Sequence, residues 1–238
     1  MNKLLTICPT FNRPDRLKEM LESFISTRSE GTDIVIYLSQ DDPQLKKYVE
    51  FISRLDFPAA HLIGERRLLV EALNFCFDSY PDYPYYHEIN DDHIYHTQGW
   101  DSKLISEIET KGQGWGIACG RDMLHDTNWH QGRLPSAMVM SGNIARTLGY
   151  IVYPEFRHTY VDDYFRELAE GIGRLFYCPE VIIEHRHFLG GKVQNDDNYR
   201  WVMSKGEMQY GSMVYHEWLK KSKDSSILEL KEAMERGK

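Results

Sequence analysis

The sequence has no long hydrophobic run. Its first apolar stretch, Leu4–Cys8, is stopped by Pro9 and is too short for a signal peptide or a membrane helix. No later stretch reaches the roughly 20 apolar residues that a membrane span requires. These absences exclude the membrane-spanning classes, and we expect a soluble, cytoplasmic protein.

Cysteine is also scarce. The four cysteines are far apart in the sequence, show no spacing typical of metal ligands, and in three cases lie in apolar runs. We therefore expect buried free thiols in a reducing compartment. These residues are Cys8, Cys76, Cys119 and Cys178.

Two further absences concern nucleotide and nucleic-acid binding. The net charge is −8, which disfavours a generic nucleic-acid binder that relies on phosphate neutralisation. A local basic groove is still compatible with this net charge. No GxGxxG fingerprint follows the first apolar stretch. This disfavours a nicotinamide or flavin enzyme of the Rossmann type.

What is present is the composition of an ordinary globular protein. The 238 residues, 42% hydrophobic and 27% charged, suit one large domain, or one domain with a C-terminal extension, and can form a substantial core. Aromatic residues make up 13% of the chain. Most of them are expected to fill the core, although carbohydrate sites also use aromatic faces.

The chain opens with a strand, a helix and a second strand. Leu4–Cys8 predicts a central strand, and Pro14 is well placed in the first turn of an amphipathic helix. Asp33–Leu38 predicts the second strand. Such a βαβ unit has parallel strands joined by a right-handed crossover. We therefore expect the loop Pro9–Arg13 to lie beside Ser39–Asp42.

The rest of the chain continues this alternation of strands and helices. It predicts an α/β fold whose C-terminal part is helical. Further strands are expected near residues 60–63, 80–86, 114–119, 138–140 and 175–187, and helices near 45–55, 66–77, 100–108, 160–168 and from 199 onward, ending in an amphipathic helix at 225–236.

The most informative stretch is Tyr85–His93. An aromatic and apolar run ends in Asn90, the adjacent carboxylates Asp91 and Asp92, and His93. That order predicts a buried strand that presents polar side chains at its carboxyl end, where open α/β sheets bind their ligands. Carboxylates suit Mg²⁺ or Mn²⁺, and the oxygens of a diphosphate would complete the coordination. A solvated surface turn is the alternative.

Two motifs in the second half have both a structural and a functional interpretation. Asp162 and Asp163 stand in the first turn of an expected helix, where carboxylates cap the helix or offset its dipole, or act on a substrate. His185 and His187 alternate along an expected strand and so share one face of it. They are either structural residues or ligands of a nearby metal.

Three segments of the first hundred residues follow a recognisable order. These are ICPTFNRPDRLKEMLESF, then IYLSQDDP, and then EALNFCFDSYPDYPYYHEINDDH. Together they resemble family-2 glycosyltransferases of the GT-A fold. In that family the first segment is a strand, a Pro-Thr-Phe/Tyr-Asn-Arg loop and a helix. The second ends in an acid near the nucleotide base, and the third carries an Asn-bearing helix and the DxD-type metal motif. The likeness recurs in patches to about residue 200.

The resemblance implies the architecture. It predicts a GT-A, Rossmann-like fold with a mostly parallel central sheet flanked by helices. The catalytic domain would span residues 1–197, with a nucleotide-binding half at about 1–100 and an acceptor and metal half at about 101–197. Residues 198–238 would form a helical C-terminal extension packed on the same domain.

The resemblance also implies roles for individual residues. Asp163 aligns with the family's general base and Asp162 with the acid before it. Asp91 and Asp92 would bind the metal, while His93 stands where the family usually has a third acid, so it either assists or marks a degenerate metal site. A C-terminal histidine, His185 or His187, would contact the metal or the diphosphate. The nucleotide and donor pocket would contain Pro9, Thr10, Asn12, Arg13, Asp41, Asp42, Arg66, Arg67, Asn74, Asp91 and Asn143, with Arg146 as a further candidate.

The implied activity is metal-dependent transfer of a sugar from a nucleotide-sugar donor to an acceptor hydroxyl. Mn²⁺ or Mg²⁺ would be the cofactor, a UDP-sugar is the default donor with GDP and others open, and a single base implies inversion. The acceptor could be a glycan, a lipid-linked sugar, a protein, a small molecule or a modified nucleic-acid base. A sugar-phosphate nucleotidyltransferase is disfavoured because PTFNRPD replaces its Gly-rich loop. The remaining alternative is a non-catalytic protein that binds nucleotides or sugars, and His93 in place of the third acid is the only residue that favours it.

Overall fold

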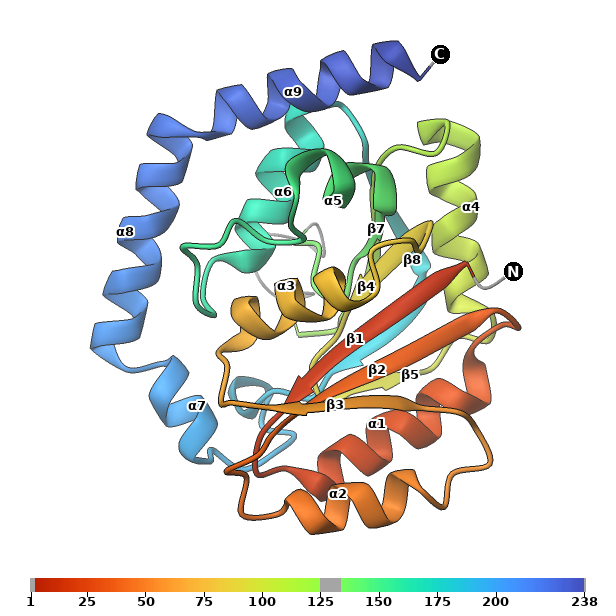
Figure 1. Cartoon of the computed structure of the whole chain (residues 1–238), viewed down its shortest axis with the longest axis vertical. Coiled ribbons are helices and arrows are strands. Elements are labelled where there is room, and N and C mark those ends of the chain that lie inside the picture. Colours follow the sequence, from red (N-terminus) through yellow and green to blue (C-terminus); the bar gives the residue numbers. More distant parts are fainter. Residues whose placement is uncertain (1–2, 125–133, 238) are drawn as a thin grey trace.

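A curved sheet forms the centre of the molecule in the computed structural model, which describes residues 3–124 and 134–237 (Figure 1). Its first strands are nearly continuous apolar runs because both of their faces are covered by helices. Within the described residues the sheet has eight strands in the order β3-β2-β1-β4-β7-β6-β8-β5. They are β1 (Leu4–Thr10), β2 (Thr32–Ser39), β3 (Ala60–Gly64), β4 (Tyr85–Glu88), β5 (His93–Tyr95), β6 (Ile117–Arg121), β7 (Val139–Ser141) and β8 (Leu175–His185).

The sheet is mostly parallel, as predicted. The strands β3, β2, β1 and β4 run parallel to one another, and β8 runs parallel to β6. The short strand β7 is antiparallel to both β4 and β6, and β5 is antiparallel to β8. The carboxyl ends of β1, β2 and β4 therefore meet at one edge, which is where α/β sheets bind ligands.

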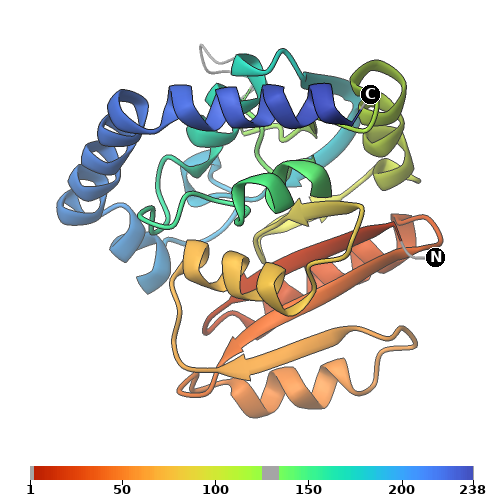
Figure 2. The ribbon, with the colours of Figure 1, turned by 45° about the horizontal axis from the view of Figure 1, so that its top comes forward.

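Helices cover both faces of the sheet, as Figures 1 and 2 show. One face carries α1, α2 and α4, and the other carries α3, α5 and α6, with α8 and α9 packed outside them. The helices are α1 (Pro14–Thr27), α2 (Leu45–Ile52), α3 (Leu69–Ser79), α4 (Trp100–Gly112), α5 (Gly142–Leu148), α6 (Val161–Gly171), α7 (Asp197–Val202), α8 (Lys205–Lys221) and α9 (Lys223–Arg236), with a short 3₁₀ turn, η1, at Phe188–Gly190.

The βαβ unit at the start of the chain follows its sequence pattern closely. Pro14 occupies the first turn of α1, where its missing N–H removes no hydrogen bond, and the apolar stripe of α1 is fully buried. The strand β1 continues through Pro9, beyond its predicted end at Cys8. This is tolerated because β4 pairs with β1 only as far as Ile7, so the side of Pro9 that lacks an N–H faces no neighbouring strand.

Several element boundaries differ from the sequence prediction, and two of them concern candidate site residues. Helix α3 begins at Leu69 because the Glu71 carboxylate accepts a hydrogen bond from the Leu68 backbone N–H (3.0 Å), which fixes the helix start. Arg66 and Arg67 consequently lie in the loop before α3. Strand β8 ends at His185, so His187 lies outside the strand.

The cysteines and the lengths of the helices bear on two further expectations from the sequence. All four cysteines are buried as free thiols, as predicted. Across residues 3–124 and 134–237, we find no helix with the length and apolar character needed to traverse a lipid bilayer.

Candidate active site

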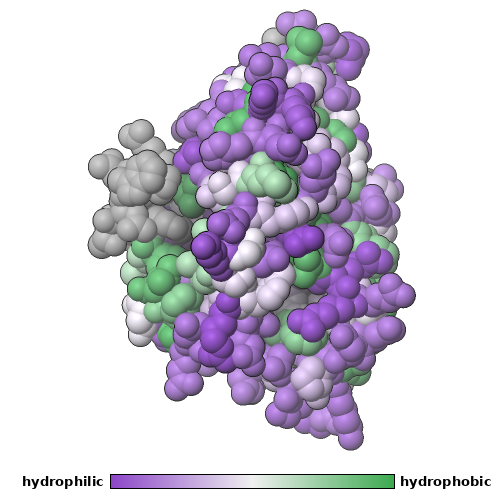
Figure 3. Space-filling model, turned by 90° about the vertical axis from the view of Figure 1, so that its left-hand side faces the viewer, coloured by the Kyte–Doolittle hydropathy of each residue, from purple (hydrophilic) through white to green (hydrophobic). Residues whose placement is uncertain are grey.

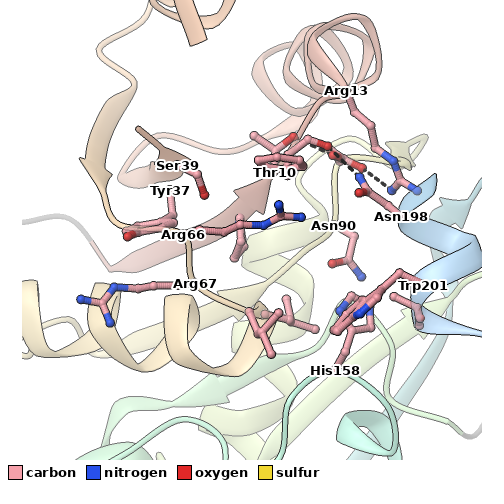
Figure 4. Close-up of a pocket in the computed structure, with 16 residues that line it drawn as sticks. Thr10, Arg13, Tyr37, Ser39, Arg66, Arg67, Asn90, His158, Asn198 and Trp201 are labelled. Atoms are coloured by element: carbon pink, nitrogen blue, oxygen red, sulfur yellow. Dashed lines mark hydrogen bonds and ion pairs between the residues drawn. The ribbon is translucent and has the colours of Figure 1, made fainter. Parts of the chain in front are cut away.

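A cavity of about 480 Å³ lies at the carboxyl edge of the parallel strands (Figure 4). Thr10 at the end of β1, Ser39 at the end of β2, and Asn90 and Asp91 after β4 contribute to its wall. The loop after β1, the strand β2, the start of α3, the loops before α3 and α6, and the helix α7 also contribute. The lining residues are Pro9, Thr10, Phe11, Arg13, Tyr37, Ser39, Arg66, Arg67, Leu68, Leu69, Asn90, Asp91, His158, Asn198, Trp201 and Val202.

The loops after β1 and β2 lie side by side, as the βαβ pattern predicts. The backbone N–H of Asn12 donates to Asp42 Oδ2, and that of Gln44 donates to Asp42 Oδ1, both at 2.7 Å. The carboxylate of Asp42 is therefore occupied in joining the two loops, whereas Asp41 is exposed. Asn12 adopts a positive φ of 54°, a conformation that asparagine tolerates better than most residues.

Arg13 and Asp91 form a buried ion pair at the floor of this edge. Arg13 Nη1 lies 3.1 Å from Asp91 Oδ1, and the Thr10 hydroxyl donates to Asp91 Oδ2 at 2.6 Å. Burial raises the pKa of the Asp91 carboxyl, and the charge of Arg13 opposes that shift. Because both carboxylate oxygens already have partners within the protein, Asp91 organises the loop after β1.

Asp92, His93 and His185 form a separate buried cluster beside the cavity. Asp92 Oδ1 lies 3.3 Å from His93 Nδ1 and 3.5 Å from His185 Nε2. The two imidazole rings are stacked with centroids 4.2 Å apart, and the residues are direct partners in the pairing of β5 with β8. One ligand atom from each of the three side chains lies within 4.8 Å of the others.

The chemistry of this cluster fits a divalent cation. Asp92 Oδ1, both ring nitrogens of His93 and Nδ1 of His185 are buried without a hydrogen-bond partner among the described residues. Buried polar atoms are normally satisfied, and an ion is one of the standard explanations for an exception. Two imidazoles and one carboxylate are a donor set that suits Mn²⁺ and other first-row ions.

The electrostatics of the cluster keep the carboxylate ionised. Burial raises the pKa of Asp92, but the positive charge of His185 and the close approach of the two imidazoles outweigh burial and hold this pKa well below its usual range. Burial lowers the pKa of His93, and the neighbouring His185 lowers it further. Metal binding requires an ionised carboxylate and neutral imidazoles. Burial lowers the pKa of His185, but the charge of Asp92 outweighs burial and raises it, so a cation bound here would displace the His185 proton.

His187 lies outside this cluster. Its Nδ1 accepts a hydrogen bond from the Leu189 backbone N–H (3.2 Å), and its ring packs edge-on against Tyr199 at 4.5 Å. Strand β8 ends at His185, two residues before His187, and the His187 ring packs edge-on against the His185 ring with centroids 5.2 Å apart. Of the two candidate C-terminal histidines, the structure therefore places His185 with Asp92 and His93.

The two carboxylates at the start of α6 face different surroundings. The charge of Asp162 contributes, after burial, to the raised pKa of Glu88, about 8, and it also acts on His185. Asp163 instead pairs with Arg166 one turn later, at 3.0 Å. Asp162 therefore lies on the side of α6 that faces the cluster.

The remaining sequence candidates divide into those at the cavity and those away from it. Arg66 extends its guanidinium into the middle of the cavity, whereas the guanidinium of Arg67 turns away and packs over Phe75 (Figure 4). Asn74 bonds the backbone of residues 151 and 152. Asn143 bonds the Gly114 carbonyl and Arg146. Neither asparagine is among the described residues that line the cavity.

Comparison with known proteins identifies the architecture. No protein-family model and no curated protein sequence matches the chain. Among solved structures, the mannosyltransferase PcManGT from Pyrobaculum calidifontis, in complex with GDP-Man and Mn²⁺, matches with a TM-score of 0.62 at 11% identity, over 98% of this chain and 74% of its own. The fold is therefore that of GT-A glycosyltransferases. S. aureus TarS in complex with UDP-GlcNAc matches this GT-A chain with a TM-score of 0.58 at 10% identity, over 93% and 74% of the two chains. TarS in complex with UDP gives 0.58 at 12%, over 76% and 60%.

Several residues at the site of this GT-A chain were not found by sequence reasoning. His158 lines the cavity, and burial together with the charge of Arg13 lowers its pKa to about 4, so it is neutral near pH 7. Asp196, Tyr199 and Trp201 come from the C-terminal helical part and contact the same edge. The pair Asn195-Asp196 before an aromatic run was the available signal, because Asp196 caps α7.

The face that carries this edge is mainly hydrophilic (Figure 3). Trp201 of the cavity wall and the nearby Met203 are 40% and 42% exposed. An aromatic side chain at a polar cavity provides a flat apolar surface on which a base or a sugar ring can stack.

Proposed function

We propose that the chain is a metal-dependent glycosyltransferase that uses a nucleoside-diphosphate sugar as donor. The observation that carries this proposal is the adjacency of two features at one sheet edge. A cavity with Arg66 in its centre lies directly beside a buried Asp92–His93–His185 cluster whose polar atoms lack partners among the described residues. The diphosphate oxygens of the donor could bind the cation and Arg66 at the same time, and the nucleoside would occupy the cavity.

The donor would be held by residues of the cavity wall. We propose that the base and ribose lie against Phe11, Ser39 and Arg66, and that Trp201 provides a stacking surface. The structural neighbours were solved with UDP, UDP-GlcNAc and GDP-Man. UDP is our default, and the panel described below includes GDP and other nucleotides.

Asp92, His93 and His185 would hold Mn²⁺ or Mg²⁺. Such an ion would neutralise the charge that builds on the departing nucleoside diphosphate. In this arrangement His93 takes the place of the third acid in the glycosyltransferase family that the sequence resembles, and the nearby His185 completes the set. Asp91 would act indirectly, by fixing Arg13 and the loop after β1.

Asp162 is our candidate for the general base. Its carboxylate would accept the proton of the acceptor hydroxyl as that oxygen bonds to the anomeric carbon and the bond from that carbon to the diphosphate oxygen breaks. A single base opposite the leaving group gives direct displacement with inversion. Asp163, which aligns with the base of the family that the sequence resembles, forms an ion pair with Arg166.

The domain limits are also part of the proposal. Residues 1–197 would form the catalytic domain, with the nucleotide-binding half at about 1–100 and the acceptor and metal half at about 101–197. Residues 198–238 would form the helical extension. Since Asn198, Trp201 and Val202 line the cavity, this extension would take part in donor binding.

The function is tested by measuring nucleoside-diphosphate release from a panel of UDP-, GDP-, ADP- and dTDP-linked sugars. The protein is assayed with Mn²⁺, with Mg²⁺ and with EDTA. We expect slow hydrolysis of one donor with either cation, and complete loss with EDTA that excess metal restores. Such a result would name the sugar and leave only the acceptor to be found.

One alternative has a specific observation in its favour. His93 in place of an acid, together with Asp91 tied to Arg13, would fit a GT-A chain that binds nucleotides or sugars without turning them over. Metal-dependent donor binding by calorimetry, without release of the diphosphate under any condition of the panel, would favour it. No donor binding at all would contradict both functions.

Arg66 provides a further prediction. Arg66→Gln is expected to raise the Kd for the nucleoside diphosphate by roughly 10- to 100-fold, because a charge-assisted hydrogen bond is lost. Arg67→Gln should cost less, since that guanidinium turns away over Phe75. Isothermal titration calorimetry measures both values. Equal losses in the two variants would contradict the placement of Arg66 in the binding site.

A further inference from the structure

The segment from Gln194 to Val202 docks on the loop after β1 through several contacts. Asp196 forms a two-point ion pair with Arg13, with Arg13 Nε at 2.8 Å from Oδ2 and Nη2 at 2.7 Å from Oδ1. Arg16 reaches the same carboxylate at 3.1 Å, and Asn198 donates to the Phe11 carbonyl at 2.7 Å. Planar two-point arginine pairs fix orientation as well as distance, so the start of α7 is held in one position.

This docking buries Tyr199 beside the cluster. Tyr199 is 5% exposed, and its ring is enclosed on several sides. The Arg13 guanidinium lies over the ring at 4.2 Å from its centroid, while the rings of His187 and Phe188 pack against it at 4.5 and 4.9 Å. A phenol enclosed in this way can direct its hydroxyl to one place only, and His187 thereby has a role that is not metal binding.

The hydroxyl of Tyr199 contacts only one of the two carboxylate oxygens of Asp92. It donates to Asp92 Oδ2 at 2.5 Å. Asp92 Oδ1 faces His93 and His185 at 3.3 and 3.5 Å but has no hydrogen-bond partner among the described residues. One oxygen is thus satisfied by the phenol, and the other is left pointing into the cluster.

We propose that Tyr199 is a positioning residue of the metal centre, which orients the Asp92 carboxylate so that Oδ1 alone faces the cation. This inference rests on the metal site of the proposed function and extends it to a residue of the C-terminal extension. Groups that orient a ligand through a hydrogen bond typically contribute 10- to 100-fold to metal affinity.

The same helix connects the metal centre to the donor cavity. Asn198 and Trp201, on either side of Tyr199 in α7, line the cavity, so a nucleotide that packs against them holds Tyr199 in place. Binding of the nucleoside and of the metal should then favour each other, and thermodynamic linkage makes the effect reciprocal.

The experiment measures the Mn²⁺ dissociation constant without nucleotide, by electron paramagnetic resonance of the free ion. Tyr199→Phe keeps the packed ring and removes only the hydroxyl, and we expect its Kd to rise about 10- to 100-fold. Tyr215→Phe is the matched control. It removes a hydroxyl of the same extension that donates to a carboxylate of α6, Glu167, at 3.3 Å, and it should leave the Kd unchanged.

The outcomes separate the inference from the proposed function. Wild-type binding with an unchanged Kd in Tyr199→Phe overturns the positioning role and leaves the metal site intact, whereas no binding by the wild type overturns both. A purely structural role would lower the melting temperature of the metal-free protein without changing the Kd. Should Tyr199→Phe not fold, Asp196→Asn releases α7 from Arg13 with the hydroxyl still present. It is expected to weaken Mn²⁺ binding in the same direction, and an unchanged Kd would count against the inference.

Discussion

Asp92→Asn is expected to abolish Mn²⁺ binding and to lower metal-dependent donor hydrolysis by on the order of 10³-fold, since the cation contributes several kcal/mol to the leaving-group step. The asparagine keeps the size of the side chain but removes the negative charge that His93 and His185 share. Calorimetric titration with Mn²⁺ and a diphosphate-release assay measure the two effects.

The control for this variant is another buried aspartate. Asp101 accepts hydrogen bonds from the Ser29 N–H and hydroxyl and from the Thr32 hydroxyl, at 2.5 to 2.8 Å. Asp101→Asn should lower the free energy of unfolding, because a buried charged acceptor is lost, while the folded fraction binds Mn²⁺ normally. If Asp92→Asn retained wild-type affinity, the metal would have to lie elsewhere.

Asp162→Asn is expected to lower the rate of donor hydrolysis by about 10²- to 10⁴-fold, the usual contribution of a general base, with an unchanged Kd for the nucleoside diphosphate. Water takes the place of the acceptor in this assay, so the prediction can be tested before the acceptor is known. The reason is that the charge of Asp162 acts on His185, a member of the cluster, and on the buried Glu88.

Asp163→Asn provides the comparison. It removes a partly exposed ion pair with Arg166, in which the side chains are 26% and 20% exposed, and such pairs contribute about 0–1 kcal/mol. We expect a small loss of stability and less than about a tenfold change in rate, an upper limit set below the contribution of a general base. The reverse ranking of the two variants would restore Asp163 as the base and would remove Asp162 from the mechanism.

The parts of the fold that the sequence predicted are those determined by local pattern. The apolar stripe of α1 and the buried runs of β1 and β2 are recognisable in the sequence. The βαβ rule then predicted that the loops carrying Asn12 and Asp42 lie side by side. The Asp91-Asp92-His93 run also stood out, because the carboxyl end of a buried strand is where α/β sheets bind their ligands.

The rest depends on long-range packing that no local pattern encodes. Arg13 and Asp196 are 183 residues apart in sequence, and each alone is an ordinary charged loop residue. The choice between His185 and His187 depended on the residue at which β8 stops. Which of Asp162 and Asp163 acts on the cluster depends on the rotation of α6 against the sheet. A helix-start pattern predicts that both carboxylates are in the first turn, but not which one faces inward.

The pairing of His93 with His185 connects the metal centre to the stability of the sheet edge. Strand β5 has only three residues and lies at the end of the strand order, and its register places His93 directly opposite His185. A slip of one residue would turn one imidazole to the other face of the sheet. A cation bound by both histidines would act as a cross-link between β5 and β8. The amide protons of this short ladder should therefore exchange with solvent more slowly in the metal-loaded protein.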